Sequence, residues 1–307
     1  MPNTGPKKNA AGSSLDSKLE ALLTRAEAVL SRLESVLPEP APEVDWDGAR
    51  AFRWRKRRGQ GFLQAVYRTA PIRLSDLKNI DRQKRAIEQN TRQFMAQRPA
   101  NNVLLTGAKG TGKSSLIKAC LNQFGKGGLR LVEVDKTDLV DLPDIVEILA
   151  PRPERFVVFC DDLSFEEGEI GYKALKVALD GSVAQTSENV LIYATSNRRH
   201  LMPEHMRENL TYQHQDDGEI HPGEGVEEKI SLSERFGLWI SFYPFRQDEY
   251  LAIVAQWLGH FGCNEKSIAQ AREDALRWAL ERGSRSGRVA WQFARDWAGR
   301  NAARPRK

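Results

Sequence analysis

Residues 102–124 read NVLLTGAKGTGKSSLIKACLNQF. Within them, GAKGTGKS (107–114) matches the pattern G-x-x-x-x-G-K-[ST], a backbone loop that surrounds phosphate groups. An apolar run typical of a strand precedes the loop and a helical pattern follows it, which is the context that this loop requires. The sequence therefore predicts a strand, a phosphate-binding loop and a helix in direct succession.

Each part of the loop has an expected role in holding the phosphates of a nucleotide. The glycines let the backbone turn its N–H groups inward, and the next helix directs its N-terminal dipole at the same anion. We expect Lys113 to contact the β- and γ-phosphates, and the Ser114 hydroxyl to hold Mg²⁺. The predicted nucleotide-binding residues of the loop are Gly107, Ala108, Lys109, Gly110, Thr111, Gly112, Lys113, Ser114 and Ser115.

Four further apolar runs lie downstream, at 129–134, 156–160, 189–195 and 238–242. Each is apolar almost throughout, as expected of strands that are buried on both faces of a parallel sheet. Helical patterns separate them, so right-handed crossovers predict a three-layer α/β/α sandwich. Only helical patterns remain after Pro244, which predicts a small all-helical domain behind an α/β core with a parallel sheet.

Polar residues follow two of these predicted strands. Asp161 and Asp162 come directly after FVVFC, and Asn197 follows NVLIYATS. We expect Asp161 to hold Mg²⁺ through its water shell, Asp162 to orient and deprotonate an attacking water, and Asn197 to hold that water. The alternatives are that the acidic pair caps the next helix and that Asn197 is a turn residue.

The order of these segments resembles that of AAA+ ATPases. GAKGTGKS is similar to the Walker A loop, FVVFCDD to the Walker B strand and ATSN to the sensor 1 element. SLSERF resembles the segment that carries the arginine finger of this family, which implies that role for Arg235. SRSGRVAWQF resembles sensor 2, with Arg288 as the better candidate and Arg285 as the second.

A narrower resemblance covers about Phe52 to Ala298. NNVLLTGAKGTGKSSL, FCDDLSFE, YATSNRRHL and EEKISLSERFGL look like the bacterial AAA+ family called domain of unknown function 815. Family analogy implies the sheet order 5-1-4-3-2, with the five strands numbered along the chain, and an adenine contact from Ile80. It also implies ATP and Mg²⁺ as cofactors, and a homo-oligomer, as a ring or filament, in which Arg235 reaches the ATP of a neighbour.

One departure from the family pattern bears on the activity. Most AAA+ proteins have glutamate where this chain has Asp162, whose side chain is one methylene shorter. Two functions therefore stand: an ATPase that couples hydrolysis to remodelling or loading of a protein or nucleic-acid client, and an ATP-dependent switch with little turnover. For Arg235 the alternative is an ion pair with Glu227 or Glu228.

The N-terminal region has a heptad pattern. Its apolar residues fall alternately four and three apart, the spacing of a helix with one apolar stripe. They are Leu15, Leu19, Leu22, Ala26, Val29, Leu33 and Val36. This helix packs either on its own domain or against another copy. The expected division is a flexible tail (1–14), this helix (15–37), a linker with a basic segment (38–73), the AAA+ core (74–243), the lid (244–300) and a basic tail (301–307).

The composition limits the remaining possibilities. The net charge is +5, and RAFRWRKRR (50–58) carries six basic residues and no acidic one. With Trp54 placed for stacking, this segment is interpreted either as a DNA or RNA contact or as a solvated surface. No apolar run is long enough to cross a bilayer, and three scattered cysteines argue against a disulfide framework or a zinc site. We expect a cytoplasmic protein without membrane insertion.

Overall fold

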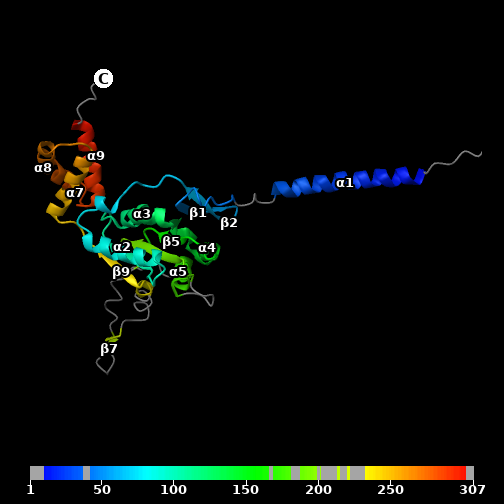
Figure 1. The fold of residues 1–307 in the computed structure, drawn as a ribbon, viewed down its shortest axis with the longest axis horizontal. Helices are drawn as coiled ribbons and strands as arrows, with labels where there is room; N and C mark the ends of the chain where they lie inside the picture. Colours follow the sequence, from blue (N-terminus) through cyan, green and yellow to red (C-terminus); the bar gives the residue numbers. More distant parts are fainter. Residues whose placement is uncertain are drawn as a thin grey trace, which may run out of the picture. The chain divides into compact units, whose positions relative to one another are not determined.

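The computed structural model describes most of the chain (Figure 1). The described residues are 10–36, 42–165, 169–180, 187–198, 201, 213–214, 220–221 and 232–301. The chain forms two units, one made of Met1–Glu43 with Lys56–Phe62 and the other of Val44–Arg55 with Leu63–Lys307.

The first unit contains the helix α1 (Ala10–Val36), so the predicted N-terminal helix is present. It begins at Ala10, five residues before Leu15. The structure therefore assigns residues 10–14 to the helix, where the sequence analysis expects a tail. Residues 1–9 and 37–41 lie outside the described part of the chain.

The larger sheet among the described residues has the strand order β2-β1-β4-β5-β6-β3-β9, and its core strands belong to the second unit. Its five core strands pair in parallel throughout. They are β3 (Val103–Gly107), β4 (Leu129–Val134), β5 (Arg155–Cys160), β6 (Val190–Ser196) and β9 (Leu238–Phe242). Counted along the chain, these strands follow the order 5-1-4-3-2, so the predicted order is confirmed.

Alternate residues of β3, β4, β5 and β6 enter two different hydrophobic clusters, one on each face of the sheet. In β3, Val103 and Leu105 join the cluster of α2 (Asp81–Met95) and α3 (Lys113–Phe124). Leu104 joins the cluster of α4 (Leu142–Leu149) and α5 (Ile170–Asp180) on the other face. Because both faces are covered at β3 to β6, these strands place apolar residues on both sides, and the predicted α/β/α layers are confirmed. The edge strand β9 is covered on one face only, since Trp239 and Ser241 are exposed.

Three helices follow the last core strand and form the predicted helical domain. They are α7 (Gln247–His260), α8 (Glu265–Glu281) and α9 (Gly287–Asn301), drawn from yellow-orange to red in Figure 1. Tyr250 of α7 and Phe293 of α9 are fully buried in the same cluster as α2 and α3. The lid is thereby packed onto the face of the core that carries α3. No helix among the described residues is long and apolar enough to cross a membrane.

Residues 38–73, expected as a linker, contain the strands β1 (Ala51–Arg57) and β2 (Gln60–Val66), which the sequence analysis did not predict. β1 extends the sheet by pairing in parallel with β4, with Phe52 opposite Val132. Phe52 and Trp54 are buried, whereas Arg53 forms an ion pair with Glu133 at 2.8 Å. The basic segment is thus a strand with one apolar face, because its large apolar residues alternate with its arginines.

Trp54 is only 2% exposed, and its Nε1 donates a hydrogen bond to Asp141 Oδ2 at 2.8 Å. The expectation that Trp54 stacks on nucleic-acid bases is therefore wrong, since its ring is packed in the core beside α4. Stacking on bases requires an exposed aromatic face.

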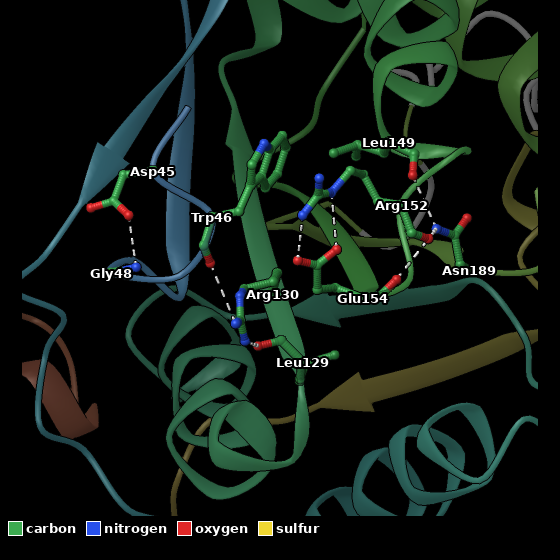
Figure 2. A network of polar contacts seen from close by, with 9 residues as sticks. All are labelled: Asp45, Trp46, Gly48, Leu129, Arg130, Leu149, Arg152, Glu154 and Asn189. Atoms are coloured by element: carbon green, nitrogen blue, oxygen red, sulfur yellow. Dashed lines mark hydrogen bonds and ion pairs between the residues drawn. The ribbon is translucent and has the colours of Figure 1, made fainter. Parts of the chain in front are cut away.

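A polar network holds the chain just before β1 against the sheet (Figure 2). The Trp46 ring packs 5.0 Å from that of Phe52, and the Arg152 guanidinium lies 4.7 Å from the Trp46 ring. Arg152 is in turn paired with Glu154 at 2.8 Å, and Asn189 Nδ2 donates to the Arg152 carbonyl at 2.8 Å. These contacts fix residues 44–50 at the amino ends of β4 and β5. The phosphate-binding loop lies at the other end of the strands, where the carboxyl ends meet.

Candidate nucleotide-binding site

The loop between β3 and α3 has a backbone that favours glycine at three positions, Gly107, Gly110 and Gly112, which all have positive φ. Gly107 has φ +125°, and a Cβ there would lie 1.9 Å from the Phe242 carbonyl oxygen of β9. Gly110 has φ +73°, and a Cβ there would lie 2.8 Å from Ser286 Oγ. The loop is therefore pressed between the last strand of the sheet and the start of the lid helix α9.

Lys113, the first residue of α3, points back into the loop. Its Nζ donates to the carbonyl oxygens of Gly107 at 2.7 Å and Ala108 at 2.9 Å, and to Asn197 Oδ1 at 3.0 Å. Burial lowers the pKa of Lys113 to about 8, although the charges of Asp162 and Asp161 act in the opposite direction. An ammonium held only by neutral oxygens in a desolvated site is suited to an anionic ligand such as phosphate.

Ser114 and Asp161 meet beside this lysine. Ser114 Oγ donates to Asp161 Oδ1 at 2.6 Å, and Thr195 Oγ1 donates to the same oxygen at 2.5 Å. Hydroxyl and carboxylate oxygens are the ligands that Mg²⁺ takes, together with phosphate oxygens and water. The pair Ser114 and Asp161 therefore fits the predicted Mg²⁺ site. Among the described residues, no group of three or more His, Cys, Asp or Glu side chains offers an all-protein metal site.

Thr195 is a site residue that the sequence analysis missed. Besides donating to Asp161, its Oγ1 accepts a hydrogen bond from the backbone N–H of Asp162 at 2.9 Å. It therefore fixes both acidic residues relative to β6. The available signal was a buried hydroxyl near the carboxyl end of the strand, two residues before Asn197.

Asn197 connects Lys113 to Asp162. Its Oδ1 accepts from Lys113 Nζ at 3.0 Å, and its Nδ2 donates to Asp162 Oδ1. Asp162 has φ +54°, a left-handed backbone conformation that is uncommon outside glycine and that clusters at functional sites. The carboxylate of Asp162 is thus held by an amide at the edge of the site rather than pointing freely into it.

These residues surround a cavity of about 540 Å³ between the core and the lid. Its phosphate end is formed by residues 109–115 with Asp161, Asp162 and Asn197. Ile80, at the start of α2, lines the apolar part of the cavity, as do three side chains from the lid, Ile253, Trp257 and Trp291. The volume lies in the range of cavities that bind small molecules and cofactors.

Arg288 projects from the lid into this cavity. The N–H of Gly287 donates to the Gly110 carbonyl at 2.8 Å, and Ser286 Oγ accepts from Val289 N at 3.3 Å as a helix cap. The N-terminus of α9 is thereby attached to the phosphate-binding loop. Arg285, the second candidate for the sensor role, precedes the cap and does not line the cavity.

Arg235 lies apart from the cavity of its own chain. Its Nε forms an ion pair with Asp180 Oδ1 of α5 at 2.6 Å. The alternative partners considered from the sequence, Glu227 and Glu228, lie outside the described residues. The structure therefore brings together all the predicted site residues around the loop except Arg235.

Binding of a phosphate-bearing nucleotide at this loop is expected to be coupled to proton uptake by Lys113 as the pH rises through about 8. Above that pH a growing fraction of the free protein carries a neutral lysine, whereas the phosphate charge favours the ammonium. Affinity should therefore decline with rising pH in this range. Calorimetric titrations in buffers of different ionisation enthalpy measure the number of protons taken up. Lys113→Ala should show no such uptake. Equal proton uptake in the wild type and in Lys113→Ala would show that Lys113 is not the group that takes up the proton.

The fold and the site together define a class of protein. A parallel sheet of this order, a phosphate-binding loop after its first core strand and a helical lid over that loop are the features of the AAA+ P-loop ATPase fold. The chain also belongs to a particular family within it, because residues 47–301 match the family described as "Protein of unknown function (DUF815)".

Solved structures support the fold. Two variants of RuvB from Thermotoga maritima each align with a TM-score of 0.50 at 16% identity, over 73% of this chain and 63% and 64% of theirs. The RuvB Holliday junction branch migration motor of the same organism aligns with a TM-score of 0.49 at 17% identity, over 73% of this chain and 63% of its own. The chain thus spans less than two thirds of these relatives. No curated protein matches it by sequence.

Proposed function

We propose that this protein binds ATP with Mg²⁺ in the cavity between core and lid and hydrolyses it to ADP and phosphate. The proposal is carried by the convergence of Lys113, Ser114, Asp161 and Arg288, from three separate elements, on one cavity. The core at 74–243 and the lid at 244–300 are part of this proposal as the two domains that enclose the nucleotide.

Each side chain of the site has a proposed role that follows from its position. Lys113 binds the β- and γ-phosphates, and Ser114 with Asp161 holds Mg²⁺, which when bound neutralises charge between these phosphates. Arg288 contacts the γ-phosphate from the lid, so closure of the lid depends on which nucleotide is present. Ile80 packs against the adenine ring. Asp162 accepts a proton from the attacking water, while Asn197 orients that water.

The hydrolysis is proposed to occur in an oligomer, as a ring or filament, and to drive remodelling or loading of a protein or nucleic-acid client. The support is the position of Arg235, which lies away from its own chain's cavity, so that an arginine finger at this residue acts on a neighbour's ATP. Such a residue stabilises the charge that develops on the transferred phosphoryl group.

One observation favours a second function, that of an ATP-dependent switch with little turnover. The Asp162 carboxylate is already engaged by the Asn197 amide, and its backbone is left-handed. A shorter acid held in this way reaches the attacking water less readily than a free glutamate. In this second function, ATP binding changes the position of the lid through Arg288, and hydrolysis is incidental.

Replacing Lys113 with alanine tests the ATP-binding step that both functions share. A hydrogen bond to a charged group is worth about 1.5–3 kcal/mol, so ATP affinity should fall at least about tenfold. Trp257 and Trp291 line the cavity and make their fluorescence a direct measure of binding. Lys126→Ala removes an equal charge at an exposed position outside the cavity and should bind normally. Equal affinity of the two variants would refute the proposed site.

A further inference from the structure

The helix α1 exposes the apolar stripe that its heptad pattern predicts. Five of its large apolar side chains are between 52% and 66% exposed. They are Leu19, Leu22, Leu23, Val29 and Leu30. A stripe of this kind on a helix of 27 residues is long enough for coiled-coil packing over more than three heptads.

Charged residues repeat every seven positions along the two flanks of this stripe. Lys18, Arg25 and Arg32 form a basic row, and Glu20 and Glu27 form an acidic row, which Glu34 continues in the sequence. At about 100° per residue, each row lies about 100° from the centre line of the stripe, on opposite sides of it. The helix therefore has one basic flank, one acidic flank and an apolar face between them.

The two rows are not spaced to pair with each other on the same helix. Lys18 and Arg25 lie two or five residues from the nearest glutamates, Glu20 and Glu27. Contacts on a helix surface need spacings of three or four. The outer face between the rows carries small residues such as Ala21, Thr24 and Ala28. Lys18, Arg25, Glu20 and Glu27 are therefore placed to meet partners on another helix.

The charge pattern selects both the partner and its direction. When identical parallel helices pack around a common axis, the basic flank of one meets the acidic flank of the next. In an antiparallel pair, basic flanks meet basic flanks and acidic flanks meet acidic flanks, which is repulsive. Complementary charges beside an apolar stripe set the orientation and choice of partner in coiled coils.

We propose that α1 assembles copies of this chain into a parallel helical bundle without the need for nucleotide. A bundle of this kind has the rotational symmetry of a closed ring. It raises the local concentration of the attached cores, so that their association becomes an intramolecular step. The proposal is independent of ATP binding and hydrolysis.

Light scattering of the full chain without nucleotide tests the assembly. The wild-type protein should have a mass that is a multiple of 34.7 kDa, and Leu22→Glu, in the centre of the stripe, should return it to 34.7 kDa. Thr24→Glu adds the same charge on the outer face and should keep the wild-type mass. Unchanged ATP affinity in Leu22→Glu shows that the core remains folded. A monomeric wild type, as expected if α1 docks on its own core, or an unaffected Leu22→Glu overturns the proposal.

Reversing the charged rows tests the direction of the helices. Changing the basic row to Glu or the acidic row to Lys, each alone, should lower the mass to that of the monomer, because like charges then meet in a parallel bundle. Changing both rows together should restore the wild-type mass. In an antiparallel pair the single reversals leave like charges facing each other as before, so an unchanged mass overturns the parallel arrangement.

Discussion

Replacing Arg235 with alanine is expected to lower ATP turnover by about 10³–10⁵-fold, the range measured for arginine fingers in GTPases, and to leave ATP affinity unchanged. The reason is its position, since the guanidinium does not line the cavity of its own chain and therefore contributes nothing to binding there. Turnover and binding measured on the same preparation separate the two effects.

The ion pair with Asp180 provides the matched control. Arg235 Nε lies 2.6 Å from Asp180 Oδ1, and the side chains are 25% and 44% exposed. A pair this exposed contributes only about 0–1 kcal/mol to stability. Asp180→Asn should therefore retain most of the turnover that Arg235→Ala loses. Equal losses of turnover in the two variants would show that Arg235 acts through this ion pair and not as a finger.

Mixed assemblies then test whether the finger acts between subunits. Lys113→Ala subunits have an intact Arg235 but a defective ATP site, and Arg235→Ala subunits have the reverse. Mixing the two should restore part of the turnover, because an intact site then meets an intact finger. If assemblies that are shown to contain both variants recover no turnover, Arg235 acts within its own chain.

Much of the core was predictable because its signals are local. The loop residues 107–114 are contiguous, and the core strands β3, β4, β5 and β6 are mostly apolar because both faces of the sheet are covered there. The strand β1, which lies between β2 and β4 in the sheet, was missed because its basic residues dominate the composition of residues 50–58. The alternation of Phe52 and Trp54 with Arg53 and Arg55 nevertheless has the period of two that a half-buried strand requires.

The cavity wall was less predictable because it is made by packing between distant segments. Trp257 of α7 and Trp291 of α9 line the cavity although they are far from the loop in sequence, and α9 is attached there by the Gly287–Gly110 hydrogen bond. No local pattern distinguishes them from ordinary core residues. The choice between Arg285 and Arg288 likewise depends on where α9 begins, because the cap at Ser286 directs the later arginine into the cavity.

Replacing Asp162 with asparagine is expected to lower turnover by about 10²–10⁴-fold, the usual contribution of a general base, without weakening ATP binding. The substitution keeps the size of the side chain, and asparagine also tolerates the left-handed backbone that Asp162 adopts at φ +54°. The loss should therefore reflect the missing carboxylate and not a change in the fold.

The neighbouring residue Asp161 supplies a control, because it carries the same carboxylate and is proposed to hold Mg²⁺ instead of the attacking water. Asp161 accepts hydrogen bonds from Ser114 and Thr195, so Asp161→Asn should abolish the Mg²⁺ dependence of ATP binding, whereas Asp162→Asn should preserve it.

The same pair of variants decides between the two proposed functions. If the protein hydrolyses ATP, Asp162→Asn binds ATP in the presence of Mg²⁺ and fails to turn it over. If it is a switch, wild type and Asp162→Asn have the same negligible rate, because the carboxylate held by Asn197 never reaches the water.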